Sequence, residues 1–159
     1  MGSADGKIVV GVDGSEGSVE ALRMAARLAP ALDASIHAVS CWHFPAIYEG
    51  YVPPDFEAFE ASTKKELEAA LDQAFGGNRP ADLTTELLRG PAPELLVEAG
   101  REAVMLVVGR RGHGGFLGMH LGSVSSACVS HAACPVLVLH EDGKIHGRSD
   151  RGRRHREHD

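Results

Sequence analysis

The chain has 159 residues, of which 43% are hydrophobic and only 5% aromatic, and its formal net charge is −6. This length fits one domain with a core of ordinary size. Neither an apolar signal core at the start nor an apolar stretch approaching the roughly 20 residues that span a bilayer is present. We therefore expect a cytoplasmic protein with no membrane partner.

Charge divides the chain into two parts. Residues 144–159 contain six Lys or Arg and three acidic residues, and the preceding 143 residues carry a net charge of −9. The basic part has no apolar periodicity and no aromatic residues among its arginines. We predict one domain over residues 1–143 and a disordered, solubilising tail over residues 144–159, and we do not expect nucleic-acid binding.

Three cysteines are spread along the predicted domain: Cys41, Cys128 and Cys134. Their number is odd and they form no C-x-x-C pair, so neither a disulfide framework nor a zinc site is indicated. We interpret them as small core residues.

The first half of the domain reads as strand, helix, strand and loop. Residues 7–12 are a β-branched run, and apolar residues recur at helical spacing over residues 19–31. Pro30 lies near the end of this helix and is expected to help stop it. Residues 35–40 form a second strand, and the three prolines in residues 41–55 predict an irregular loop.

The second half continues the alternation. A long helix with one apolar stripe is predicted over residues 56–75, a third strand over 83–88 and a short helix over 93–101. Two further strands are predicted at residues 104–108 and 136–139, with a helix between them. This order favours an α/β fold, a doubly wound parallel sheet of five strands with right-handed crossovers and helices on both faces.

Glycines follow the fourth predicted strand in a spaced pattern. Gly109 and Gly112 enclose Arg110 and Arg111, and nine residues separate Gly112 from Gly122-Ser123. The loop ends at serines that suit a helix start, where unpaired N–H groups attract an anion. We expect Ser125 and Ser126 to be cap residues. The alternative is that the glycines only shape a long turn.

Asp13 ends the first predicted strand, as Gly109 ends the fourth. Ligands of such sheets bind beyond the carboxyl ends of the strands, where the strand order reverses. If the two strands are neighbours, Asp13 lines the same crevice as the glycine loop and could hold a ribose hydroxyl or a phosphate-bound metal. The alternative is a helix-capping arrangement with Glu16.

Several motifs together resemble the universal stress protein family over about residues 5–140. They are Val10-Gly11-Val12-Asp13-Gly14-Ser15, Leu88-Arg89-Gly90-Pro91-Ala92, the glycine loop, and the closing stretch from His131 to Leu139. The loop matches the pattern G-2x-G-9x-G-(S/T) of the family's ATP-binding branch at every fixed position. The chain is therefore identified as a single-domain member of that branch.

The resemblance implies an adenine nucleotide alpha-hydrolase-like fold with strand order 3-2-1-4-5. It also implies a site for ATP and Mg²⁺, in which Asp13 is a candidate metal ligand and most of the metal binding comes from the phosphates. Adenine and ribose are expected against Gly11, Val12 and Asp13, with Ala38 beside the base. The part of the nucleotide that faces the glycine loop is expected to contact Val108, Gly109, Arg110, Arg111, Gly112, Gly122, Ser123, Val124 and Ser125.

Related enzyme classes lack their required residues here. The loop after the first strand has no H-x-G-H histidines, and no glycine is followed by the Lys-Ser or Lys-Thr of a P-loop. An acceptor aspartate of a response regulator is missing from Leu88-Arg89-Gly90. We therefore expect no dedicated catalysis, and at most slow ATP hydrolysis through Mg²⁺ and loop positioning.

Two functional hypotheses remain. The first is an ATP-binding protein that regulates a stress response, and the second is a nucleotide-free dimeric scaffold that works through protein contacts. Both predict a homodimer, because the apolar strand at Val136–Leu139 would lie at a sheet edge and could pair with a second copy. The glycine spacing favours the first hypothesis.

Overall fold

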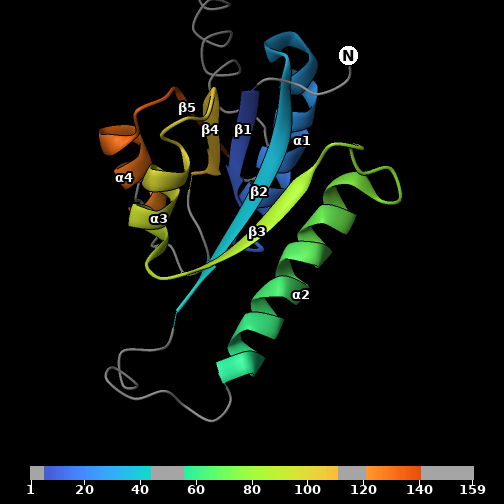
Figure 1. The fold of residues 1–159 in the computed structure, drawn as a ribbon, viewed down its shortest axis with the longest axis vertical. Coiled ribbons are helices and arrows are strands. Elements are labelled where there is room, and N and C mark those ends of the chain that lie inside the picture. The colour runs from blue at the N-terminus through green and yellow to red at the C-terminus, as the bar shows by residue number, and fades with distance from the viewer. Residues whose placement is uncertain (1–5, 44–55, 111–120, 141–159) are drawn as a thin grey trace, which may run out of the picture.

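A computed structural model describes residues 6–43, 56–110 and 121–140. Strands and helices alternate along these residues (Figure 1). In chain order the elements are β1 (Gly6–Gly11), α1 (Glu16–Leu32), β2 (Ala34–Trp42), α2 (Phe56–Phe75), β3 (Thr84–Arg89), α3 (Ala92–Ala99), β4 (Met105–Gly109), α4 (Ser123–His131) and β5 (Val136–Leu139). Of the loop predicted over residues 41–55, residues 44–55 lie outside the described residues, as do the tail over residues 144–159 and the site residues Arg111 and Gly112.

The five strands form one parallel sheet in the order β3-β2-β1-β4-β5, which confirms the predicted fold. β1 lies between β2 and β4, and Val10 pairs with Ala38 on one side and with Val107 on the other. The strand order therefore reverses between β1 and β4. In sheets of this kind, that reversal is where a ligand site forms.

Side chains of the sheet alternate between two apolar layers. Ile8, Val10 and Val107 point into the layer beneath α1 and α2, where Leu22 and Leu71 are fully buried. The opposite layer, beneath α3 and α4, is built from Val9, Val39, Leu96, Leu106, Val108 and Cys128. Both faces of the sheet are covered, as its near-continuous apolar strands predict (Figure 1).

Most element boundaries differ from the sequence-based prediction by one to three residues, and the ends of α1 and β2 show why. Pro30 does not stop α1, which continues to Leu32 and ends where Asp33 adopts a left-handed φ of 48°. The N–H of Asp33 donates to the carbonyls of Ala29 and Pro30, so capping contacts beyond the proline close the helix. β2 also extends through Trp42, because Val39 to Trp42 pair with β3.

Within the described residues, no helix is both long and apolar enough to cross a membrane.

Candidate functional site

The carboxyl edge of the sheet is the edge at which all five strands end. Val10 and Val107 are paired neighbours, so the ends of β1 and β4 lie side by side. β1 is followed by buried Val12 and exposed Asp13, and β4 by Arg110. The reversal of strand order thus brings the predicted site residues of the first and fourth strands together.

Asp13 contacts the start of α1 without capping it. Its Oδ1 accepts hydrogen bonds from the backbone N–H of Ser15 at 3.0 Å and from the Ser15 hydroxyl. Ser15 is the N-cap, and its Oγ accepts from the N–H of Ser18 at 3.3 Å. The alternative in which Asp13 and Glu16 form a capping arrangement is therefore wrong, because Ser15 is the N-cap and α1 begins at Glu16. Within the described residues, the second carboxylate oxygen of Asp13 has no hydrogen-bond partner.

Arg110 closes the base of the glycine loop through its backbone. Its N–H donates to the carbonyl of Leu139 at 2.7 Å, and its carbonyl accepts from the N–H of Gly122 at 2.8 Å. The hydroxyl of Ser125 donates to the same carbonyl at 2.6 Å. The end of β4 and the start of α4 are thereby joined directly.

The first turn of α4 has no side-chain cap. Gly122 is the N-cap residue, and the first backbone bond of the helix runs from the N–H of Ser126 to its carbonyl. The prediction that Ser125 and Ser126 cap this helix is wrong, because Gly122 is held at the cap position by Arg110. The N–H groups of Ser123, Val124 and Ser125 are left without an acceptor in the described part of the chain. Such groups and the helix dipole favour an anion.

Two glycines of the predicted site have packing roles. A Cβ on Gly109 would lie 3.0 Å from the backbone carbon of Gly17, so this glycine lets the first turn of α1 approach β4. A Cβ on Gly11 would lie 2.8 Å from Leu96 of α3. Sequence reasoning assigned both glycines to a nucleotide, and the structure adds that two helices require them.

Ala38 does not reach the carboxyl edge. It is fully buried beneath α1 and α2 and pairs with Val10, inside the strand. The β2 residue that reaches the edge on this face is Ser40, whose hydroxyl donates to the carbonyl of Val12 at 2.7 Å. Sequence reasoning missed Ser40. The available signal was a serine at an inward position of an otherwise apolar alternation.

Arg110 places a positive charge at the end of β4. Its Nε atom is buried and, among the described residues, lacks a hydrogen-bond partner. A buried unpaired donor on a cation is costly, and an anion would satisfy it. Among the described residues, this edge therefore has three backbone N–H groups at α4 and one guanidinium nitrogen of Arg110 without a hydrogen-bond acceptor.

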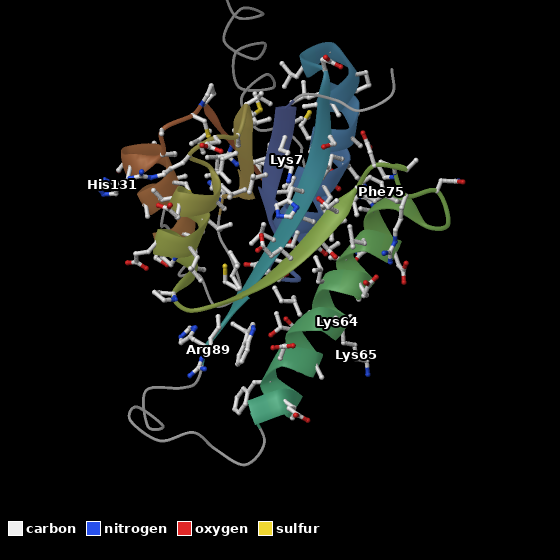
Figure 2. All side chains as sticks on the ribbon, viewed as in Figure 1. Lys7, Lys64, Lys65, Phe75, Arg89 and His131 are labelled. Atoms are coloured by element: carbon white, nitrogen blue, oxygen red, sulfur yellow. The ribbon has the colours of Figure 1, made fainter. Side chains whose placement is uncertain are left out.

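The far half of the edge, where β2 and β3 end, is held by its own contacts. The guanidinium carbon of Arg89 lies 5.9 Å from the centroid of the Trp42 ring (Figure 2). Gly90 donates its N–H to the carbonyl of Trp42 at 2.8 Å, and its φ of 141° favours glycine. This half differs from the half at β1 and β4, where several donors lack acceptors among the described residues.

The three cysteines are free thiols on the α3 and α4 side of the sheet. Burial raises the pKa of Cys41 and of Cys128 to about 11, and it also raises the pKa of Cys134. All three are therefore protonated at neutral pH and are poor nucleophiles. In the residues that the structure describes, no three His, Cys, Asp or Glu side chains are grouped as a metal site.

In a comparison with known protein families, residues 6–140 match the universal stress protein family. Universal stress protein Rv1996 of Mycobacterium tuberculosis is 33% identical over 156 residues, which cover 85% of this chain and 48% of that protein. The chain thus spans about half the length of this relative.

Two solved structures illustrate the shared fold. Universal stress protein UspA from Lactobacillus plantarum matches with a TM-score of 0.66 and 22% identity, over 84% of this chain and 96% of that one. A universal stress protein in complex with cAMP matches with a TM-score of 0.54 and 26% identity, over 87% of this chain and 99% of that one.

Proposed function

Since the chain belongs to the universal stress protein family, we propose that it binds ATP with Mg²⁺ between β1 and β4. In this proposal, nucleotide occupancy regulates contacts with other proteins during stress. The structural relative in complex with cAMP supports an adenine nucleotide as the class of ligand. ATP, Mg²⁺ and a regulatory role are our own assignments.

The open first turn of α4 is the observation that carries this proposal. Gly122 supplies no side-chain cap, and the N–H groups of Ser123, Val124 and Ser125 lack acceptors among the described residues. A phosphate chain supplies the acceptors and the negative charge that a helix start favours. The unpaired Nε of Arg110 fits the same ligand, because a phosphate oxygen would satisfy it.

Asp13 is assigned to the other end of the nucleotide. It is exposed after β1, and its contacts with Ser15 use only one of its two carboxylate oxygens. The remaining oxygen would accept a ribose hydroxyl or face a Mg²⁺ ion held by the phosphates. We assign no residue to hydrolysis.

A homodimer is part of the proposal. β5 (Val136–Leu139) is the edge strand next to β4, and each of its four apolar residues is half-buried. Val129 of α4 is 54% exposed. Pairing of β5 with a second copy would cover apolar surface and unpaired backbone groups. A monomeric mass by light scattering at tens of micromolar protein would contradict this assignment.

Titration calorimetry of Mg-ATP into the full chain tests the nucleotide site. We expect saturable heat with the wild type and at least tenfold weaker binding for Gly122→Val and Asp13→Ala. The φ of −76° at Gly122 suits valine, so this variant adds bulk at the helix start without backbone strain.

Matched controls lie in the α2–β3 connection. A Cβ on exposed Gly77 would meet nothing within 4 Å, and Asp82 is also exposed. Gly77→Val and Asp82→Ala should leave affinity unchanged. No heat with the wild type, or equal affinity for all four variants, would favour the nucleotide-free scaffold.

A further inference from the structure

Three polar side chains are buried in the described part of the chain. They are Ser18, Ser40 and Ser125, with 2%, 3% and 1% exposure. Each hydroxyl donates to a backbone carbonyl near the carboxyl edge, at 2.8 Å from Ser18, 2.7 Å from Ser40 and 2.6 Å from Ser125. The acceptors are the carbonyls of Ser15, Val12 and Arg110.

Two of these bonds join segments that are distant in sequence. Ser40 of β2 holds the residue that follows β1, and Ser125 of α4 holds the residue that follows β4. The Ser18 bond is local, within the first turn of α1. Ser40 and Ser125 therefore fix the two loops that frame the proposed nucleotide site.

The direction of a held carbonyl determines the direction of the next N–H group. In a planar trans peptide, the C=O of one residue and the N–H of the following residue point in opposite directions. The Val12 carbonyl points to the buried Ser40 hydroxyl, so the N–H of Asp13 points away from that hydroxyl. A carbonyl oxygen turned toward a phosphate would repel it, whereas an N–H group would bind it.

We propose that Ser40 and Ser125 are positioning residues for the nucleotide. Each keeps one loop carbonyl in the interior, so that the site presents donors to the phosphates and the ribose. This inference rests on the proposed function. It also changes the role of Ser125, whose hydroxyl donates to the Arg110 carbonyl at 2.6 Å and lies 3.2 Å from the Gly122 carbonyl, so backbone carbonyls and not a phosphate take its hydrogen bond.

The two serines should differ in effect. Within the described residues, Ser40 is the hydrogen-bond donor to the Val12 carbonyl, whereas the Arg110 carbonyl also accepts from the N–H of Gly122. Ser40→Ala therefore releases its carbonyl, and Ser125→Ala leaves one donor in place. We expect ATP binding to weaken about tenfold in Ser40→Ala and about threefold in Ser125→Ala.

Ser18→Ala is the matched control. Ser18 is as deeply buried, and the variant also loses one buried hydroxyl bond. The Ser15 carbonyl nevertheless still accepts hydrogen bonds from the N–H groups of Ser18 and Val19, at 3.1 and 3.2 Å. Ser18→Ala should lower the unfolding temperature as the other variants do, but leave the affinity for ATP unchanged.

The test is titration with Mg-ATP well below the unfolding temperature of each variant. Ser40→Thr restores a hydroxyl with a residue suited to strands, and it should recover affinity to within threefold. Amide hydrogen exchange without nucleotide adds a second readout, because exchange at Val12 and Asp13 should speed up in Ser40→Ala and not in Ser18→Ala.

Each outcome is decisive. A wild type that binds no ATP overturns the proposed function and this inference with it. A wild type that binds ATP while Ser40→Ala binds equally well overturns only the inference. Equal losses of affinity in Ser18→Ala and Ser40→Ala would also overturn it, because a general loss of buried hydrogen bonding would then explain both.

Discussion

Two of the helices that follow strands at the carboxyl edge, α1 and α4, differ in how their first N–H groups are satisfied. At α1, Ser15 caps the helix, Glu16 places a negative charge in the first turn, and Asp13 binds Ser15. At α4, Gly122 offers no side chain, and the first turn contains no acidic residue. At α1 the N–H of Ser18 has an acceptor and a carboxylate lies in the first turn, whereas at α4 the N–H groups of Ser123, Val124 and Ser125 all lack an acceptor among the described residues, which favours an anion there. The comparison favours the start of α4 over the start of α1 as the site proposed for the phosphates.

Giving α4 a cap of its own should have the largest effect. Gly122→Asp places a carboxylate where the backbone has the extended conformation of an N-cap, with φ of −76° and ψ of 175°. We expect ATP binding to weaken about a hundredfold, because the carboxylate competes for the amides and repels phosphate. The folded state should gain roughly 0.5 kcal/mol from the cap and the dipole.

Gly122→Asn separates the two causes of this effect. It occupies the same N–H groups without adding charge, so its loss of affinity should be smaller and less dependent on salt. Calorimetry and thermal unfolding measure both quantities. An unchanged affinity in Gly122→Asp would show that α4 does not bind the phosphates.

Separating α1 from β4 should have the next largest effect. Gly109→Ala places a Cβ 3.0 Å from the backbone of Gly17, so the first turn of α1 must shift. We expect a loss of about 2 kcal/mol in the free energy of unfolding, measured in urea. Gly77→Ala, with open space around its added Cβ, should stay within about 0.5 kcal/mol. Similar values for both variants would contradict the packing role of Gly109.

Removing the cap of α1 should reduce stability more than it reduces binding. Ser15→Ala deletes the side-chain acceptor for the N–H of Ser18, which keeps the Ser15 carbonyl at 3.1 Å, and should cost about 1 kcal/mol in the free energy of unfolding. ATP affinity should change less than threefold, since the phosphates are assigned to α4. If this variant lost binding as strongly as Gly122→Asp, the start of α1 would be the anion site.

The topology could be predicted from the sequence because it depends on repeated local signals. Five short apolar runs, separated by helical periodicity, leave little choice besides a parallel sheet. The neighbouring positions of β1 and β4 follow from that topology and from the family resemblance. The spacing of Gly109 and Gly122 likewise identified the two ends of the glycine loop, which the hydrogen bond from Gly122 to the Arg110 carbonyl joins.

The details of the site depend on tertiary contacts that cannot be predicted from local sequence patterns. Ser123, Ser125 and Ser126 all suit a helix start, and the cap falls on Gly122 because Arg110 binds its N–H. Strand register decides that Ser40 reaches the edge and that Ala38 stays inside. The packing role of Gly109 depends on where α1 lies across the sheet.

The two faces of the sheet should also respond differently to alkaline pH, and this effect is the smallest. All three cysteines belong to the layer beneath α3 and α4, and none belongs to the layer beneath α1 and α2. Burial raises the pKa of Cys41 and Cys128 from 9.0 to about 11, so the unfolded chain releases these protons at lower pH than the folded chain. The stabilising contribution of the neutral thiols is therefore complete below pH 9 and is lost as the pH rises toward 11.

Urea unfolding across this range should show a shallower decline of the free energy of unfolding in Cys128→Ala than in the wild type. Amide exchange should accelerate in α3 and α4 before it does in α1. Equal slopes in both proteins would mean that the thiols do not determine the alkaline limit of this face.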